Sequence, residues 1–102
     1  MEAMNLKELT KELNNAETFG SMAVRVTYQK VLEQQPGETE LSDLKEALIN
    51  GIDRAFTKED EELTATYLLL YCDLCDYAKD HLPREAYHRF CENKYFDPIY
   101  IA

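Results

Sequence analysis

Along the first third of the chain, apolar residues recur every three or four positions with charged residues between them, which is typical of an amphipathic helix. In the first helix this spacing is carried by Leu6, Leu9, Leu13 and Ala16. Gly20 and Ser21 interrupt the pattern, because glycine is costly inside a helix and serine is a favourable N-cap. We therefore predict one helix from Leu6 and, over residues 22–33, a second helix or a bent continuation of the first, with Ser21 placed to cap it.

The second segment carries two conflicting patterns. The apolar positions of "MAVRVTY" alternate in the period of a strand, and valine favours strands. These positions are Met22, Val24, Val26 and Tyr28. A strand needs a partner strand, however, and no other segment alternates comparably, so we expect residues 22–33 to be helical.

A third amphipathic helix follows a turn at "PG", residues 36–37, with Thr39 placed to cap it. Its apolar stripe consists of Leu41, Leu44, Leu48, Ile52, Ala55 and Phe56. Lys45 lies on the opposite, polar side, and Gly51 is expected to weaken this helix slightly.

The fourth helix, through about His81, is the most apolar and should lie at the centre of the bundle. Its apolar stripe consists of Leu63, Tyr67, Leu70, Leu74, Tyr77 and His81, and it is widened by Leu68, Leu69 and Tyr71. We expect Thr57 to cap this helix. The acidic run of residues 59–62 then fills the first turn, where the helix dipole favours negative charge.

Pro83 ends the fourth helix and is tolerated at the start of a fifth one, over residues 84–95. The fifth helix should bury Tyr87, Phe90 and Cys91. The chain then closes with "FDPIYIA", in which four residues are large and apolar. We expect this tail, residues 96–102, to fold back over the bundle rather than to dock into a partner, and residues 1–4 to be disordered.

These patterns predict an all-α protein with a single domain, residues 1–102, built as a small antiparallel bundle of four or five helices. A chain of 102 residues suffices for one ordinary core but not for two. With only 3 glycines and 3 prolines, the chain has few helix breakers.

The charge balance narrows the range of partners. The chain has 20 acidic and 11 basic side chains and a net charge of -9, which repels phosphate backbones and anionic membranes. We therefore expect no direct binding to nucleic acid or to membranes, and a basic surface on any protein partner. No apolar run approaches the roughly 20 residues that span a bilayer. The start "MEAMNLKELTKEL" also lacks the apolar segment of a secretory signal, so we expect a cytoplasmic protein.

The stretch "CDLCDYAKDHLPREAYHRFC" contains all 3 cysteines and both histidines. Its spacing, C-x2-C-x12-H-x2-C, falls within the range of structural zinc sites and makes a zinc-stabilised helical module the alternative function. The ligands would be Cys72, Cys75, His88 and Cys91. Against this, a helical projection turns Cys72 away from the apolar face, and the CxxC lies inside a helix rather than in a tight turn. The competing interpretation is that the cysteines are small hydrophobic residues and that no cofactor is bound.

Patterns typical of catalysis are missing from the sequence. It contains no phosphate-binding glycine loop, GxSxG, HExxH or EF-hand pattern. His88 lies three residues from Cys91, but no orienting group or oxyanion site accompanies the pair. We therefore expect that the protein is not an enzyme.

Tyrosines gather towards the C-terminus, where six of the seven lie between Tyr67 and Tyr100. Tyrosine is enriched in protein interfaces, although packing of the last two helices would also account for some of these residues. Our hypothesis is a non-catalytic protein that binds another protein as an inhibitor, immunity factor or adaptor. A homodimer and an acidic mimic of nucleic acid are further alternatives, the latter disfavoured by basic residues interspersed through most helices. The residues expected to contact the partner are Glu59, Asp60, Glu61, Glu62, Tyr95, Phe96 and Tyr100.

Overall fold

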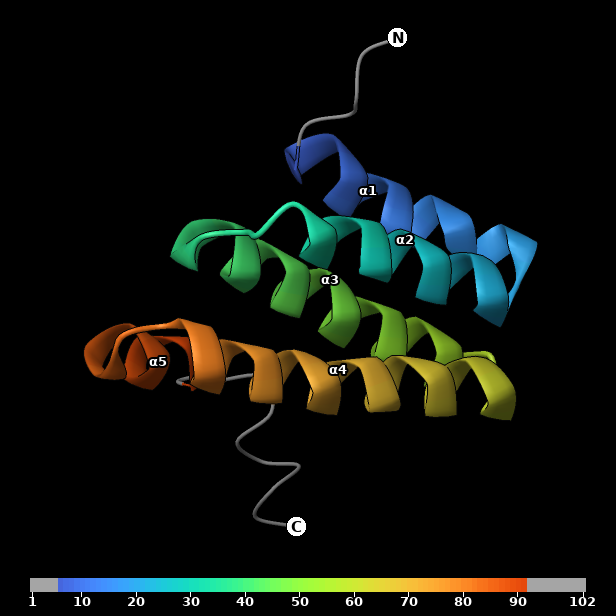
Figure 1. Cartoon of the computed structure of the whole chain (residues 1–102). Coiled ribbons are helices and arrows are strands. Elements are labelled where there is room, and N and C mark those ends of the chain that lie inside the picture. The colour runs from blue at the N-terminus through green and yellow to red at the C-terminus, as the bar shows by residue number, and fades with distance from the viewer. Residues whose placement is uncertain (1–5, 92–102) are drawn as a thin grey trace, which may run out of the picture.

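The computed structural model describes residues 6–91, which form five α-helices and a short 3-10 helix (Figure 1). They are α1 (Leu6–Ala16), η1 (Glu17–Phe19), α2 (Ser21–Glu33), α3 (Glu38–Thr57), α4 (Glu61–His81) and α5 (Arg84–Cys91). This part of the chain contains no strand, and the predicted all-α bundle is confirmed. The predictions for residues 1–4, for 96–102 and for the end of the last helix lie outside the described residues.

From α1 to α4, successive helices run antiparallel, and α4 lies along the edge of the arrangement opposite α1 (Figure 1). α3 contacts α1, α4 and α5, while α4 also contacts α2 and α5. α1 and α2 form a pair on the side of α3 away from α5 (Figure 1). Within residues 6–91, no helix has the length and apolar character that crossing a membrane requires.

The α2 segment is helical, as predicted, and its burial shows why the strand-like alternation has no effect. Val24, Tyr28 and Val31 are buried, and they are spaced by four and three residues. Met22 and Val26 belong to the alternating pattern but are 71% and 45% exposed. The helical period therefore decides which of these residues enter the core.

Two of the predicted helix caps are wrong by one or two residues. α2 begins at Ser21 itself, and its N-cap is Gly20, whose φ of 103° is a conformation that serine rarely adopts. α3 begins before Thr39, with Gly37 as the N-cap. The Gly37 N–H donates a hydrogen bond to the Glu40 carboxylate at 3.0 Å, so the cap is completed from inside the first turn.

Gly51 does more than weaken α3, because it makes room for the Tyr67 ring of α4. A Cβ atom at position 51 would lie within 2.6 Å of three atoms of that ring. Both residues are buried. The glycine therefore permits the close approach of α3 and α4.

Several predicted core residues are exposed instead. Phe56 is 73% exposed at the end of α3. Leu68 and Leu69 of α4 are 42% and 61% exposed. Cys91 and His81 are exposed as well. The His81 ring stacks on the Tyr77 ring at a centroid distance of 3.9 Å.

Candidate functional site

The four residues of the zinc hypothesis do not come together as ligands. Among residues 6–91, no group of three or more His, Cys, Asp or Glu side chains is placed to hold a metal ion. Cys72 and Cys91 are exposed and Cys75 is partly buried. On α4, Cys72 faces solvent, so this structure does not bring it together with the other three residues as a ligand set. Burial raises the pKa of the Cys75 thiol, which suits a neutral packing residue.

The acidic run lies on the tight turn that joins α3 to α4. The Glu59 N–H donates to the Phe56 carbonyl at 3.0 Å, and the Asp60 N–H donates to the Ala55 carbonyl at 2.9 Å. This pair of bonds is the Schellman pattern, in which a left-handed residue ends the helix. Glu59 is that residue, with a φ of 61°, although glycine usually occupies the position. A carboxylate-bearing residue thus occupies a position that glycine would occupy with less backbone strain.

Asp60, and not the predicted Thr57, caps α4. Its Oδ1 accepts a hydrogen bond from the Leu63 N–H at 3.1 Å. Thr57 is the last residue of α3, and its hydroxyl donates to the Asp53 carbonyl at 2.8 Å. The chain reverses between Thr57 and Asp60, so only Asp60 is in position to meet the free N–H groups of α4.

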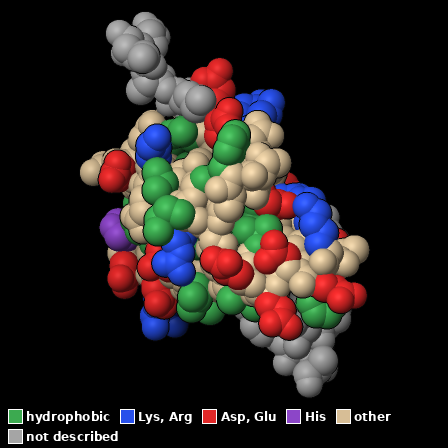
Figure 2. All heavy atoms as spheres, turned by 90° about the vertical axis from the view of Figure 1, so that its right-hand side faces the viewer, with side chains coloured by type: hydrophobic (Ala, Val, Ile, Leu, Met, Phe, Trp, Pro, Cys, Tyr) green, Lys and Arg blue, Asp and Glu red, His purple; other side chains and the backbone are tan. Residues whose placement is uncertain are grey.

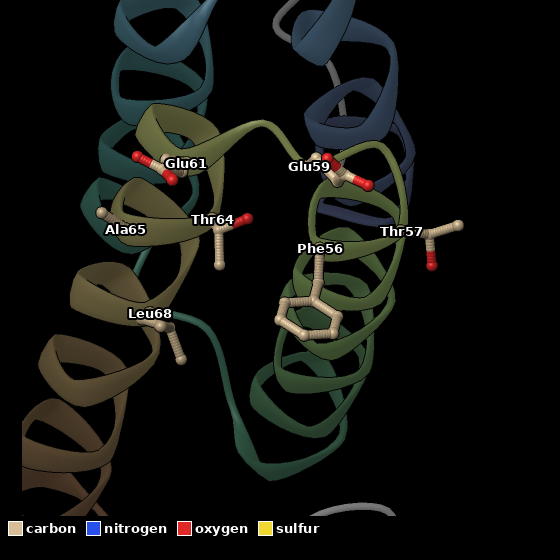
Figure 3. Close-up of a pocket in the computed structure, with 7 residues that line it drawn as sticks. All are labelled: Phe56, Thr57, Glu59, Glu61, Thr64, Ala65 and Leu68. Carbon is tan, nitrogen blue, oxygen red and sulfur yellow. The ribbon is translucent and has the colours of Figure 1, made fainter.

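An open groove of about 670 Å³ lies between the end of α3 and the first half of α4 (Figure 3). Its walls carry exposed apolar side chains, Phe56 from α3 and Leu68 from α4. Glu59 and Glu61 stand at its end, beside the α3–α4 turn (Figure 3). We call it the α3–α4 groove, and it is lined by Phe56, Thr57, Glu59, Glu61, Thr64, Ala65 and Leu68.

A second hollow of about 330 Å³ lies on the other side of α4, against α2. It is lined by Ser21, Met22, Arg25, Glu62, Ala65, Thr66 and Leu69. We call it the α2–α4 hollow, and it shares Ala65 with the α3–α4 groove. At this end of the bundle, hydrophobic side chains are interspersed with carboxylates (Figure 2).

The carboxylates around the groove have no basic partner among residues 6–91. Ion pairs within that range join Glu17 to Arg54 and Lys58, and Glu38 to Arg89, and none of these involves a groove carboxylate. Lys58 is next to Glu59 in sequence, but its ammonium group lies 3.2 Å from the Glu17 carboxylate. The negative charge of the acidic run is therefore left facing solvent.

A buried carboxylate ties the two walls of the groove together. The Glu17 side chain is only 7% exposed and accepts hydrogen bonds from Arg54 of α3 and from the Tyr67 hydroxyl of α4, each at 2.8 Å. Arg54 is two residues from Phe56, and Tyr67 precedes Leu68. The Glu17 network thus holds both apolar walls in a fixed relation, which reduces the cost of ordering them on binding.

The charge state of Glu17 follows from these contacts. Burial, the largest influence, would raise the pKa of its carboxyl, but hydrogen bonds from Arg54, Tyr67 and Lys58 together outweigh burial and lower the pKa. In Tyr67, burial followed by the hydrogen bond to Glu17 raises the pKa of the hydroxyl. The pair therefore consists of an ionised carboxylate and a neutral hydroxyl at neutral pH.

Of the predicted interface residues, the structure places Glu59, Asp60, Glu61 and Glu62 at one end of the bundle. Asp60 serves the α4 cap, whereas Glu59 and Glu61 line the groove and Glu62 lines the α2–α4 hollow. Tyr95, Phe96 and Tyr100 lie outside the described residues, and their role stays a prediction.

The apolar half of the site, namely Phe56, Ala65, Leu68 and Leu69, was not predicted from the sequence. A usable signal was present, because Ala65, Leu68 and Cys72 repeat at a spacing of three and four residues on the outer side of α4. Comparison of the chain with protein-family models, with curated proteins and with solved structures found no match.

Proposed function

We propose that the protein acts without catalysis, by binding another protein at the α3–α4 groove, as an inhibitor, immunity factor or adaptor does. The observation that carries this proposal is an exposed apolar groove bordered by carboxylates that have no basic partner in the described part of the chain. An apolar centre with a polar border is the usual anatomy of a protein interface.

The shape of the groove favours a macromolecule over a small molecule. Small-molecule sites enclose most of their ligand's surface. Here the wall residues Phe56 and Leu68 are themselves 73% and 42% exposed, so the groove is open along its length. The net charge of -9 adds long-range attraction for a basic partner and speeds its encounter with the site.

The chemistry of the lining supports a non-catalytic role. No cysteine or histidine lines the groove. Its two threonine hydroxyls are engaged with the backbone, Thr57 with the Asp53 carbonyl and Thr64 with the Asp60 carbonyl. The groove therefore has hydrogen-bonding and apolar groups but lacks a nucleophile with an adjacent base.

The test is a comparison of tagged variants in cells of the source organism. Phe56→Asp should abolish capture of the partner, whereas Phe19→Asp should not. Phe19 is a matched control, because it is 81% exposed and lines neither the groove nor the α2–α4 hollow. Equal capture by both variants would show that the groove is not the interface.

A second pair of variants tests the charge. Reversing Glu59, Glu61 and Glu62 to lysine should weaken capture strongly, and the loss should be greatest at low salt. The matched control reverses three exposed carboxylates near the α4–α5 end, Asp76, Asp80 and Glu85, and changes the net charge by the same amount. If both triple variants lose the partner equally, net charge and not this site governs binding.

A further inference from the structure

We infer that the partner presents a basic amphipathic α-helix, which packs lengthwise on the outer face of α4. This inference rests on the proposed function and specifies what occupies the site. It follows from three properties of α4: a second apolar stripe, the α3–α4 groove and the α2–α4 hollow (together the two hollows) beside that stripe, and the placement of its carboxylates.

α4 has an apolar stripe on its outer face in addition to the one that builds the core. Ala65, Leu68 and Cys72 are exposed and spaced by three and four residues, continuing the spacing from Glu61. A helix at the surface of a bundle normally shows solvent a polar face there. The spacing of three and four is the one at which one helix packs against another.

The two hollows flank this stripe. The α3–α4 groove adjoins Leu68 on one side, and the α2–α4 hollow adjoins Leu69 on the other. Ala65 lines both and has the smallest side chain of the stripe. A helix that packs along α4 over Ala65 can approach closely and place one large apolar side chain in the α3–α4 groove and another in the α2–α4 hollow.

The carboxylates match such a helix in position. Glu61 lies in line with the stripe and lines the α3–α4 groove, whereas Glu62 lies to one side of the stripe and lines the α2–α4 hollow. Each precedes a leucine, Leu68 or Leu69, by seven residues. At about 1.5 Å per residue, seven residues correspond to about 10 Å along α4. A partner helix with lysine or arginine two turns from its apolar anchors would meet both carboxylates.

Charge argues against a second copy of this chain as the occupant. Glu59, Glu61 and Glu62 are acidic, whereas Arg25 is basic, among the residues that line the two hollows. In a two-fold contact each patch faces itself, so these carboxylates would be brought together. An extended peptide is disfavoured too, because residues 6–91 offer no strand edge for it to extend.

The experiment uses three fluorescent peptides with the intact protein at physiological ionic strength. The first is a Leu–Lys peptide with leucines at heptad positions a and d; the second is a scrambled peptide of the same composition; the third is the Leu–Glu version of the first. We expect the Leu–Lys helix to bind at least about tenfold more tightly than the scrambled peptide, and the Leu–Glu helix not to bind. Equal binding of the scrambled peptide would show attraction by charge alone and overturn the inference.

Ala65→Arg locates the helix, since it fills the point that the two hollows share. The variant should weaken Leu–Lys binding at least about tenfold, while Ser42→Arg should leave it nearly unchanged. Ser42 is an exposed residue of α3 that lines neither hollow, and the two variants add the same charge. Equal effects of the two variants would overturn the placement on α4.

The outcomes separate this inference from the proposed function. If the Leu–Lys helix fails to bind while Phe56→Asp still abolishes capture of the natural partner, the helical occupant is wrong and the groove remains the interface. If sedimentation detects a dimer that Ala65→Arg dissociates, the occupant is a second copy, which also overturns the inference. If the natural partner binds Phe56→Asp normally, the proposed function itself fails.

Discussion

Leucines on the two faces of α4 differ in what they contribute to the molecule. Leu74 faces inward and is fully buried, whereas Leu69 faces outward and is 61% exposed. The inner face also carries Tyr67, which fits over Gly51 and donates a hydrogen bond to Glu17. The inner face therefore determines the fold, whereas the outer face stays exposed within residues 6–91, which supports the proposal that it binds a partner.

The largest expected effect contrasts these two leucines. Leu74→Ala should lower the free energy of unfolding by about 3 kcal/mol, because it leaves a cavity in a closely packed core. Leu69→Ala should change it by less than about 0.5 kcal/mol, because its side chain is mostly solvated. Urea denaturation measures both values. Similar losses in the two variants would show that the outer face also supports the fold.

The next effect tests the contact between α3 and α4. Gly51→Ala should destabilise the protein by about 3 kcal/mol, because the new methyl group overlaps the Tyr67 ring. A glycine in an open helix would behave in the opposite way, since alanine there stabilises by roughly 0.5–1 kcal/mol. The sign of the change in the free energy of unfolding, measured by urea denaturation, therefore shows whether Gly51 is packed against Tyr67. Adding Tyr67→Leu to the variant should restore part of the loss.

A smaller effect is expected from the Glu17 network. Glu17→Gln should cost about 2 kcal/mol at neutral pH, because it removes an ionised acceptor from Arg54 and Tyr67. Since the folded-state pKa of Glu17 is lowered, its contribution is present above the ordinary glutamate pKa of 4.5 and is lost as the pH falls through the lower value. The two proteins should therefore converge in stability in acid. A constant difference across that range would contradict the assigned ionisation of Glu17.

The smallest effect separates stability from binding at the turn. Glu59→Gly should stabilise the fold by about 1 kcal/mol, because glycine adopts the left-handed conformation without strain. It should also weaken partner binding, because it removes a carboxylate from the groove. Gln35→Gly is the matched control, since Gln35 has a φ of 53° and lies away from the groove. Thermal unfolding and partner capture, measured on both variants, should show stabilisation in each and weaker capture only for Glu59→Gly.

The helices themselves could be predicted because their signal is local. In α2, the residues Val24, Tyr28 and Val31 already carry the spacing that places them in the core. The predicted caps were less successful at Thr57, because several neighbouring residues can cap a helix and the path of the turn selects Asp60. Of the acidic residues predicted to contact a partner, Glu59 and Glu61 line the groove, and their role in binding stays a prediction.

Burial at the edges of the apolar stripes was predicted less well. Consecutive helical residues are rotated by about 100°, so Ala55 and Phe56 face different directions. Ala55 is fully buried and Phe56 points outward into the groove. Leu68 and Leu69 are displaced from the core in the same way, beside the buried Tyr67 and Leu70. A stripe that is wider than one helical face thus becomes a second surface.

The sequence by itself determined the all-α class, the approximate extent of each helix and the acidic character of the α3–α4 turn, since these depend on periodicity and on residues close along the chain. Only the tertiary structure decided that Gly51 packs against the Tyr67 ring, and that Lys45 is buried with its ammonium group hydrogen-bonded to the Phe90 carbonyl. It likewise decided that Glu17 joins Arg54 and Tyr67, which lie 37 and 50 residues further along the chain. Such contacts depend on how whole helices are placed against each other, and the spacing of residues within one helix does not contain that information.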